Sequence, residues 1–98
     1  MRNDSAIADL EPGDSVELPC RISAAEVTPA RVGHVPNTVV DLLVRVKEYE
    51  GLVARAALTH CRDAALAALA KNPLVHDEQV ARQLLDAYLH AFGDQLAV

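Results

Sequence analysis

The sequence predicts a mainly α-helical α+β chain in which short β segments precede a sheaf of three antiparallel helices. Residues 1–36 hold four of the five prolines and one stretch of alternating polarity, whereas later residues show apolar side chains three or four positions apart. Because the chain has only three aromatic side chains, the helices must pack closely on Ala, Val and Leu. We therefore expect a β and irregular segment, 1–36, and a helical segment, 37–98.

Short β pieces are expected before the helices. Residues 15–18 (SVEL) alternate polar and apolar side chains, which is typical of a half-buried strand. Residues 12–14 (PGD) are typical of a turn, and Pro19 limits the length of the strand or places it at the edge of a sheet. Residues 20–23 could continue this strand, with either 27–28 or 31–32 as a short partner.

A long first helix is predicted directly after Pro36. Asn37 or Thr38 is suited to cap it, and it should run to Leu58. Charged pairs Asp41–Arg45 and Arg45–Glu48 are expected on its outer side. Its inward side chains are expected to be Val39, Leu43, Val46, Tyr49, Val53 and Ala57.

Two shorter helices should follow a break at residues 60–62 (HCR). The first is expected over 63–71, with Leu66 and Leu69 one turn apart, and it ends at residues 72–73 (NP). Asp77 can cap the next helix, 78–92, and Gly93 occupies the position of a C′ glycine. Its inward side chains are expected to be Val80, Leu84, Leu85, Tyr88 and Phe92.

Composition excludes several classes of protein. A net charge of -5 with scattered basic residues is unlike a nucleic-acid-binding protein, which needs clustered Lys and Arg. No stretch of about 18 apolar residues is free of charge, so a membrane span is not expected. The first residues resemble no signal peptide, and two cysteines, Cys20 and Cys61, suit a reduced compartment. We therefore expect a soluble cytoplasmic chain.

Few residues stand out as chemical candidates. His60 and Cys61 are adjacent but lack the further ligands that a tetrahedral zinc site needs, so a loop or partial core role is favoured. Residues 76–78 (HDE) fit a helix start, where acidic side chains meet the macrodipole favourably. His34 in a turn and His90 on an exposed helix side are also expected to be structural.

Two carboxylates of the long helix flank Tyr49. Glu48 and Glu50 are two positions apart and point about 200° away from each other, so they cannot form a paired acid–base site. Glu50 lies beside the apolar stripe, where a structural ion pair or an interface hydrogen bond is favoured. The chain shows no dinucleotide fingerprint, P-loop, nucleophile elbow or HExxH motif. The residues alone thus predict only a small, α-rich soluble domain.

The sequence contains an ordered set of phrases: 3–7 (NDSAI) with Leu10, 14–20 (DSVELPC), 46–50 (VKEYE) with 52–53 and 56–58, 62–69 (RDAALAAL) with 72–75, and 80–81 (VA) with 84–86 (LLD). Together these phrases resemble the C-terminal end of glycoside hydrolase family 4, the NAD- and manganese-dependent 6-phospho-glucosidases and their α-galactosidase and α-glucosidase relatives. Ser5 stands where the family usually has Gly, and residues 54–55, 60–61 and 90–92 also depart from the family's usual residues.

This resemblance implies a fragment without catalytic groups. In the family, NAD and Mn²⁺ are held upstream of the matched region. The two cysteines and four histidines here do not match the metal-ligand motif, so catalytic, cofactor-binding and metal residues are all expected to be none. The implied partners are the N-terminal catalytic domain of the same enzyme and further copies in a homo-oligomer.

Two alternatives remain open from the sequence. One is a stand-alone, non-enzymatic helical oligomerisation or adaptor module, since an uncovered apolar surface drives association. The other is a small ligand-binding protein with a pocket between its helices.

Overall fold

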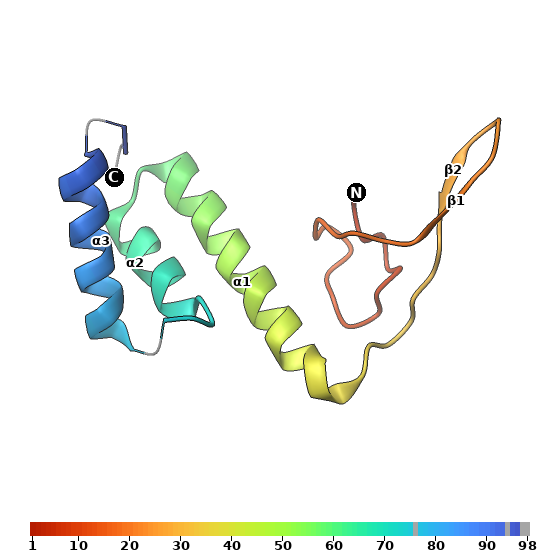
Figure 1. The fold of residues 1–98 in the computed structure, drawn as a ribbon, viewed down its shortest axis with the longest axis horizontal. Coiled ribbons are helices and arrows are strands. Elements are labelled where there is room, and N and C mark those ends of the chain that lie inside the picture. Colours follow the sequence, from red (N-terminus) through yellow and green to blue (C-terminus); the bar gives the residue numbers. More distant parts are fainter. Residues whose placement is uncertain (76, 94, 97–98) are drawn as a thin grey trace. The chain divides into compact units, whose positions relative to one another are not determined.

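The computed structural model describes residues 1–75, 77–93 and 95–96. In chain order it contains β1 (Cys20–Ile22), β2 (Val27–Pro29), α1 (Asn37–Thr59), α2 (Arg62–Lys71) and α3 (Glu78–Phe92), as Figure 1 shows. Three helices after a two-stranded antiparallel sheet confirm the predicted α+β class. The chain forms two compact units, Met1–Val44 and Arg45–Val98, and α1 passes from one into the other.

The first unit is organised around Asn3, which is 1% exposed. Its side-chain Nδ2 donates to the carbonyl oxygens of Ile7, Leu10 and Glu11 at 2.9, 3.2 and 3.1 Å. Its Oδ1 accepts the backbone N–H of Ile7 at 2.7 Å. One amide thus takes the place of a regular hydrogen-bond ladder in the irregular segment, where buried backbone groups need partners. The small apolar core beside it contains Ile7, Leu10 and Val16, with Leu18, Val35, Leu43 and Val44 packed against them.

The strand predicted over 15–18 is wrong. Residues 15–18 contain no strand: Ser15 forms an isolated bridge with Arg2, and the backbone N–H of Val16 donates to the Met1 carbonyl at 2.8 Å. The alternation did mark burial, since Val16 is buried and Leu18 half-buried between exposed neighbours. The partner segment turns after Asn3, where Asp4 and Ser5 have a positive φ, and Pro19 has no N–H to donate, so a longer ladder does not form.

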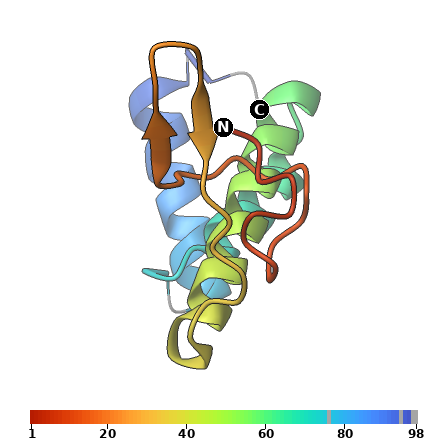
Figure 2. The same ribbon diagram turned by 90° about the vertical axis from the view of Figure 1, so that its right-hand side faces the viewer.

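The strands lie further along, at residues that the sequence offered as a continuation. Cys20 pairs with Pro29, Arg21 with Thr28 and Ile22 with Val27, and Figure 2 shows the two strands side by side. Of the two predicted partners, 27–28 is therefore confirmed, and 31–32 forms no strand.

Helix α1 covers 23 residues, about 34 Å, and begins and ends within one residue of the predicted bounds. Its inward face is much less covered than predicted, because Ala56 is its single buried residue. Val39 and Val53 are exposed, and so is Ala57. The helix therefore presents an apolar stripe that the described residues leave largely uncovered.

The predicted charged pairs on α1 are replaced by contacts to α2. The Nε of Arg45 donates to the Lys71 carbonyl at 2.8 Å, and the Nζ of Lys71 lies 2.6 Å from Glu48 Oε2. Glu50 pairs with Lys47 at 2.7 Å, which confirms its predicted structural ion pair. Arg45 and Glu48 thus contact the end of α2 and not each other, because that helix end offers both an unpaired carbonyl and an ammonium group.

Helices α2 and α3 pack directly against each other, whereas α1 lies farther from both (Figure 1). Small side chains make this close contact, with Ala68 2% and Ala81 0% exposed, beside Leu85 at 5%. Asp77 caps α3 as predicted, since its Oδ1 accepts the Val80 N–H at 2.7 Å. Asn72 ends α2 as predicted.

Two expectations for α3 need correction. Val80, Tyr88 and Phe92 were predicted inward but are exposed, because the apolar face of α3 is wider than the Ala-rich helix that covers it. Gly93 does cap the helix, but in the right-handed conformation and not the left-handed one typical of a C′ glycine. A Cβ on Gly93 would lie 2.5 Å from the Leu89 carbonyl oxygen, so close approach is the reason for glycine.

Candidate functional site

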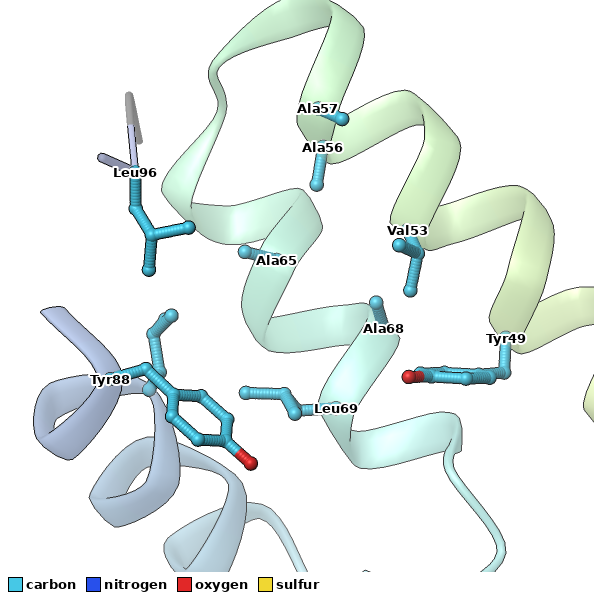
Figure 3. A pocket seen from close by; sticks show the side chains of 10 residues that line it. Tyr49, Val53, Ala56, Ala57, Ala65, Ala68, Leu69, Tyr88 and Leu96 are labelled. Carbon is cyan, nitrogen blue, oxygen red and sulfur yellow. The ribbon is translucent and has the colours of Figure 1, made fainter. Parts of the chain in front are cut away.

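Side chains from three helices of the second unit surround an apolar hollow of about 260 Å³ (Figure 3). In this view Val53 and Tyr49 of α1 lie on one side, Tyr88 and Leu96 on the other, and the alanines of α2 between them. The lining residues are Tyr49, Val53, Ala56, Ala57, Ala65, Ala68, Leu69, Leu85, Tyr88 and Leu96.

The hollow follows from side-chain size. Helices α1 and α2 are joined at one end by a short loop and linked at the other by the long side chains of Arg45, Glu48 and Lys71. Between these two ends α2 presents alanines, whose single methyl groups do not reach across to α1. Native interiors are normally filled to crystal-like density, so an apolar gap of this size is unusual.

The hollow is open to solvent. Val53, Tyr88 and Leu96 at its rim are 42%, 45% and 40% exposed. Other apolar side chains are more exposed still, with Ile22 of β1 at 77%, Leu58 of α1 at 82% and Leu74 at 86%. Large exposed apolar patches mark interaction surfaces in folded proteins.

The predicted break between α1 and α2 is confirmed, and its two candidate residues are exposed loop residues without a core role. His60 has a left-handed φ of 53°, and Cys61 has an extended backbone at the N-cap of α2. Within residues 1–75, 77–93 and 95–96, no three His, Cys, Asp or Glu side chains lie close enough together to hold a metal ion.

The remaining candidate residues either form ion pairs within the fold or are exposed. Glu78 forms an ion pair with Arg82 on α3, and His90 is exposed as predicted. His76 lies outside the described residues. None of the helices in the described part of the chain is both long and apolar enough to span a bilayer.

His34 contacts a carboxylate that the sequence did not single out. Asp9 Oδ1 lies 3.0 Å from His34 Nδ1, and Asp9 Oδ2 accepts the Val35 N–H at 2.8 Å. The hydrogen bond to His34 and then that to Val35 hold the pKa of Asp9 below its ordinary value of 3.8. These contacts join residues 25 and 26 positions apart, a separation at which the sequence carries no periodic signal.

Acid should weaken the contacts of Asp9 with His34 and Val35 in the first unit. Because folding lowers the pKa of Asp9, its contribution to stability is complete above pH 3.8 and is lost as the pH falls through the lower, folded value. We expect Asp9→Asn to reduce the loss of stability over that pH range, as measured by amide exchange of Val35. Glu17→Gln, at an exposed acid, should leave the pH dependence unchanged, and an equal effect of both variants would contradict the assignment.

Ser5 has a strained backbone. Its φ is 68°, in the left-handed region that costs residues with a Cβ roughly 1–2 kcal/mol. Glycine adopts this conformation freely but loses more entropy on folding. We expect Ser5→Gly to raise the free energy of unfolding by roughly 0.5–1 kcal/mol, measured by urea denaturation. Ser23→Gly, at an exposed turn without positive φ, should be neutral or destabilising. A destabilising Ser5→Gly would show that φ strain is not the controlling factor.

Comparison with known proteins places this fold in a family. Residues 1–75 match the family model described as the family 4 glycosyl hydrolase C-terminal domain. The chain belongs to glycosyl hydrolase family 4. The match covers the first unit, α1 and α2, and so includes the Asn3-centred segment and seven of the ten residues that line the hollow, from Tyr49 to Leu69.

Relatives of this family 4 domain are much longer proteins. A probable 6-phospho-β-glucosidase of Bacillus subtilis is 37% identical over 89 residues, which are 91% of this chain and 20% of that protein. Two crystal structures of a 6-phospho-α-glucosidase from gut microorganisms superpose with a TM-score of 0.87 each. One contains NAD and glucose-6-phosphate and is 32% identical, covering 97% of this chain and 22% of its own. The other contains NAD and Mn²⁺ and is 31% identical, covering 95% and 22%.

The chain therefore spans about a fifth of the length of the relatives that it matches. Across the described residues no metal-ligand group is assembled, and the sequence contains no glycine-rich dinucleotide fingerprint. The sequence-based resemblance to family 4 is confirmed.

Proposed function

We propose that this family 4 domain is the non-catalytic C-terminal part of a 6-phospho-glucosidase, in which it packs against the catalytic domain and supports contacts between subunits. The observation that carries the proposal is that the chain corresponds to only a fifth of relatives named as 6-phospho-glucosidases. The exposed apolar side chains support it, since Leu58 and Leu74 at 82% and 86% exposure are the kind of residue that a partner surface covers.

Cofactor chemistry belongs to the rest of the enzyme in this proposal. NAD and Mn²⁺ would supply redox and Lewis-acid chemistry on the catalytic domain, where the dinucleotide fold and the metal ligands lie. The present chain would contribute the rigid helical surface against which that domain is held, because its own side chains provide no ligand set in the described residues.

A complementation assay tests this function. The Bacillus subtilis relative is shortened by the segment that matches this chain, and is assayed with NAD⁺, Mn²⁺ and nitrophenyl 6-phospho-glucosides. We expect no turnover by the 98-residue chain alone and a gain of turnover when the shortened relative is co-expressed with it. The relative's own C-terminal segment is the positive control. Turnover by the chain alone, or rescue by that control but not by this chain, would contradict the proposal.

The same exposed side chains also favour a second function, a non-enzymatic helical module that self-associates. Ile22 and Val27 pair across the hairpin and are 77% and 58% exposed, which is costly for an isolated two-stranded sheet in water. Light scattering over a concentration series distinguishes the two functions. A chain that remains monomeric and binds no apolar dye would rule out the module.

A further inference from the structure

The size and the chemistry of the hollow in the second unit limit what can bind there. An engineered apolar cavity of roughly 150 Å³ accommodates benzene. The hollow among α1, α2 and α3, at about 260 Å³ and open on one side, is therefore large enough for one bicyclic ring or two branched side chains. It is too small for a further helix, whose diameter with side chains is about 10–12 Å.

The charges around the hollow already compensate each other. Glu48 pairs with Lys71 on the α1–α2 side, and Arg62 of α2 pairs with Asp86 of α3. No charged side chain is among the lining residues. An occupant with a charge would have to be desolvated there without a partner, which is strongly unfavourable. The occupant is therefore uncharged.

Two tyrosines supply polar atoms near this apolar surface. Figure 3 shows the hydroxyls of Tyr49 and Tyr88 beside the otherwise hydrocarbon walls. No hydrogen bond of either hydroxyl is found within the described part of the chain. Tyr88 is 45% exposed, so water can reach its hydroxyl, and an aromatic ring with an N–H or O–H would fill the hollow and replace that water as the partner.

We propose that the hollow is an anchor site for an aromatic side chain of the family's catalytic domain. This inference rests on the proposed function and names the surface and the partner group that it requires. The catalytic domain is the occupant because relatives carry about four-fifths of their length outside the matched segment, and seven of the ten lining residues, Tyr49 to Leu69, lie in the family-matched range.

Charge insertion at two separate walls tests the anchor site. Val53→Glu places a carboxylate on the α1 wall, and Leu96→Glu places one on the opposite wall, beyond the end of α3, where no helix is disturbed. Ala54→Glu is the matched control, because Ala54 is on the same helix as Val53, is exposed and does not line the hollow. Circular dichroism establishes that each variant remains helical.

Binding to the shortened Bacillus subtilis relative is measured by sedimentation velocity, with indole titrations of the isolated chain as a second readout. We expect Val53→Glu and Leu96→Glu to weaken association about tenfold or more, and Ala54→Glu to change it less than about twofold. Indole should bind the chain alone and should be excluded from the complex.

The outcomes separate the two proposals. If the unaltered chain associates and all three variants associate equally, the anchor site is wrong and the proposed function stands. If the unaltered chain does not associate while the relative's own segment does, the proposed function fails and the anchor with it. Self-association that Val53→Glu abolishes would identify a second copy as the occupant, and indole that stays bound in the complex would identify a small-molecule site. Either result overturns the catalytic-domain anchor.

Discussion

Replacing Asn3 by alanine is expected to lower the free energy of unfolding of the first unit by about 3 kcal/mol. The change removes one acceptor and one amide nitrogen that serves three carbonyl oxygens, of which those of Ile7 and Leu10 are buried with it. A buried polar group left without a partner costs about 1–3 kcal/mol. Several such groups would lose their partner together, and water can reach only some of them.

Amide exchange of Ile7 and Val16 measures this effect, because both lie in the small core that Asn3 supports. Asn3→Asp is the informative second variant, since it keeps the size and the acceptor but places a carboxylate against carbonyl oxygens. It should be at least as destabilising at neutral pH. Glu17→Ala, at an exposed residue of the first unit, is the control and should change stability by less than about 0.5 kcal/mol. Equal, small effects at positions 3 and 17 would show that the amide is dispensable.

Leu85→Ala is expected to destabilise the second unit by about 2–3 kcal/mol. Leu85 is 5% exposed in the contact between α2 and α3, and large-to-small substitutions in cores cost about 2–5 kcal/mol. The lower part of that range applies because Leu85 also lines the open hollow, so the space left behind is accessible to solvent and to movement of Leu96.

Thermal unfolding followed by circular dichroism at the helix band measures this loss. Leu74→Ala is the matched control, since Leu74 is the same residue type at 86% exposure and should shift stability by less than about 0.5 kcal/mol. An effect of Leu85→Ala no larger than that of Leu74→Ala would mean that α2 and α3 do not form a cooperative pair.

The helices were predictable because their signals are local. Asp77 caps α3 and Asn72 ends α2 at the expected positions, since capping depends on backbone groups within three or four residues. The strand position was not predictable in the same way. Alternation at 15–18 reports that one side of a segment is buried, and it does not report whether a neighbouring backbone is available to pair.

The sequence analysis offered a pocket between the helices as an alternative, but it carried no signal for which residues line the hollow. The periodicity of α1 identified its apolar stripe, with Val53 expected inward, but the stripe says nothing about how far the next helix stands away. That distance depends on contacts such as Arg45 to the Lys71 carbonyl, 26 residues along the chain. The pairs expected within α1 formed instead across helices, because a helix end presents unpaired carbonyl groups that compete for the same arginine.

The sequence by itself determined the helical segments, the N-cap of the last helix and the family, because these depend on local spacing and on ordered phrases along the chain. Only the tertiary structure revealed that Asn3 holds the first segment together, that Asp9 contacts His34, and that α1 and α3 leave an apolar hollow over α2. The physical reason is that hydrogen bonds and cavities of this kind join residues by distance in space, and no periodic pattern in the sequence encodes that distance.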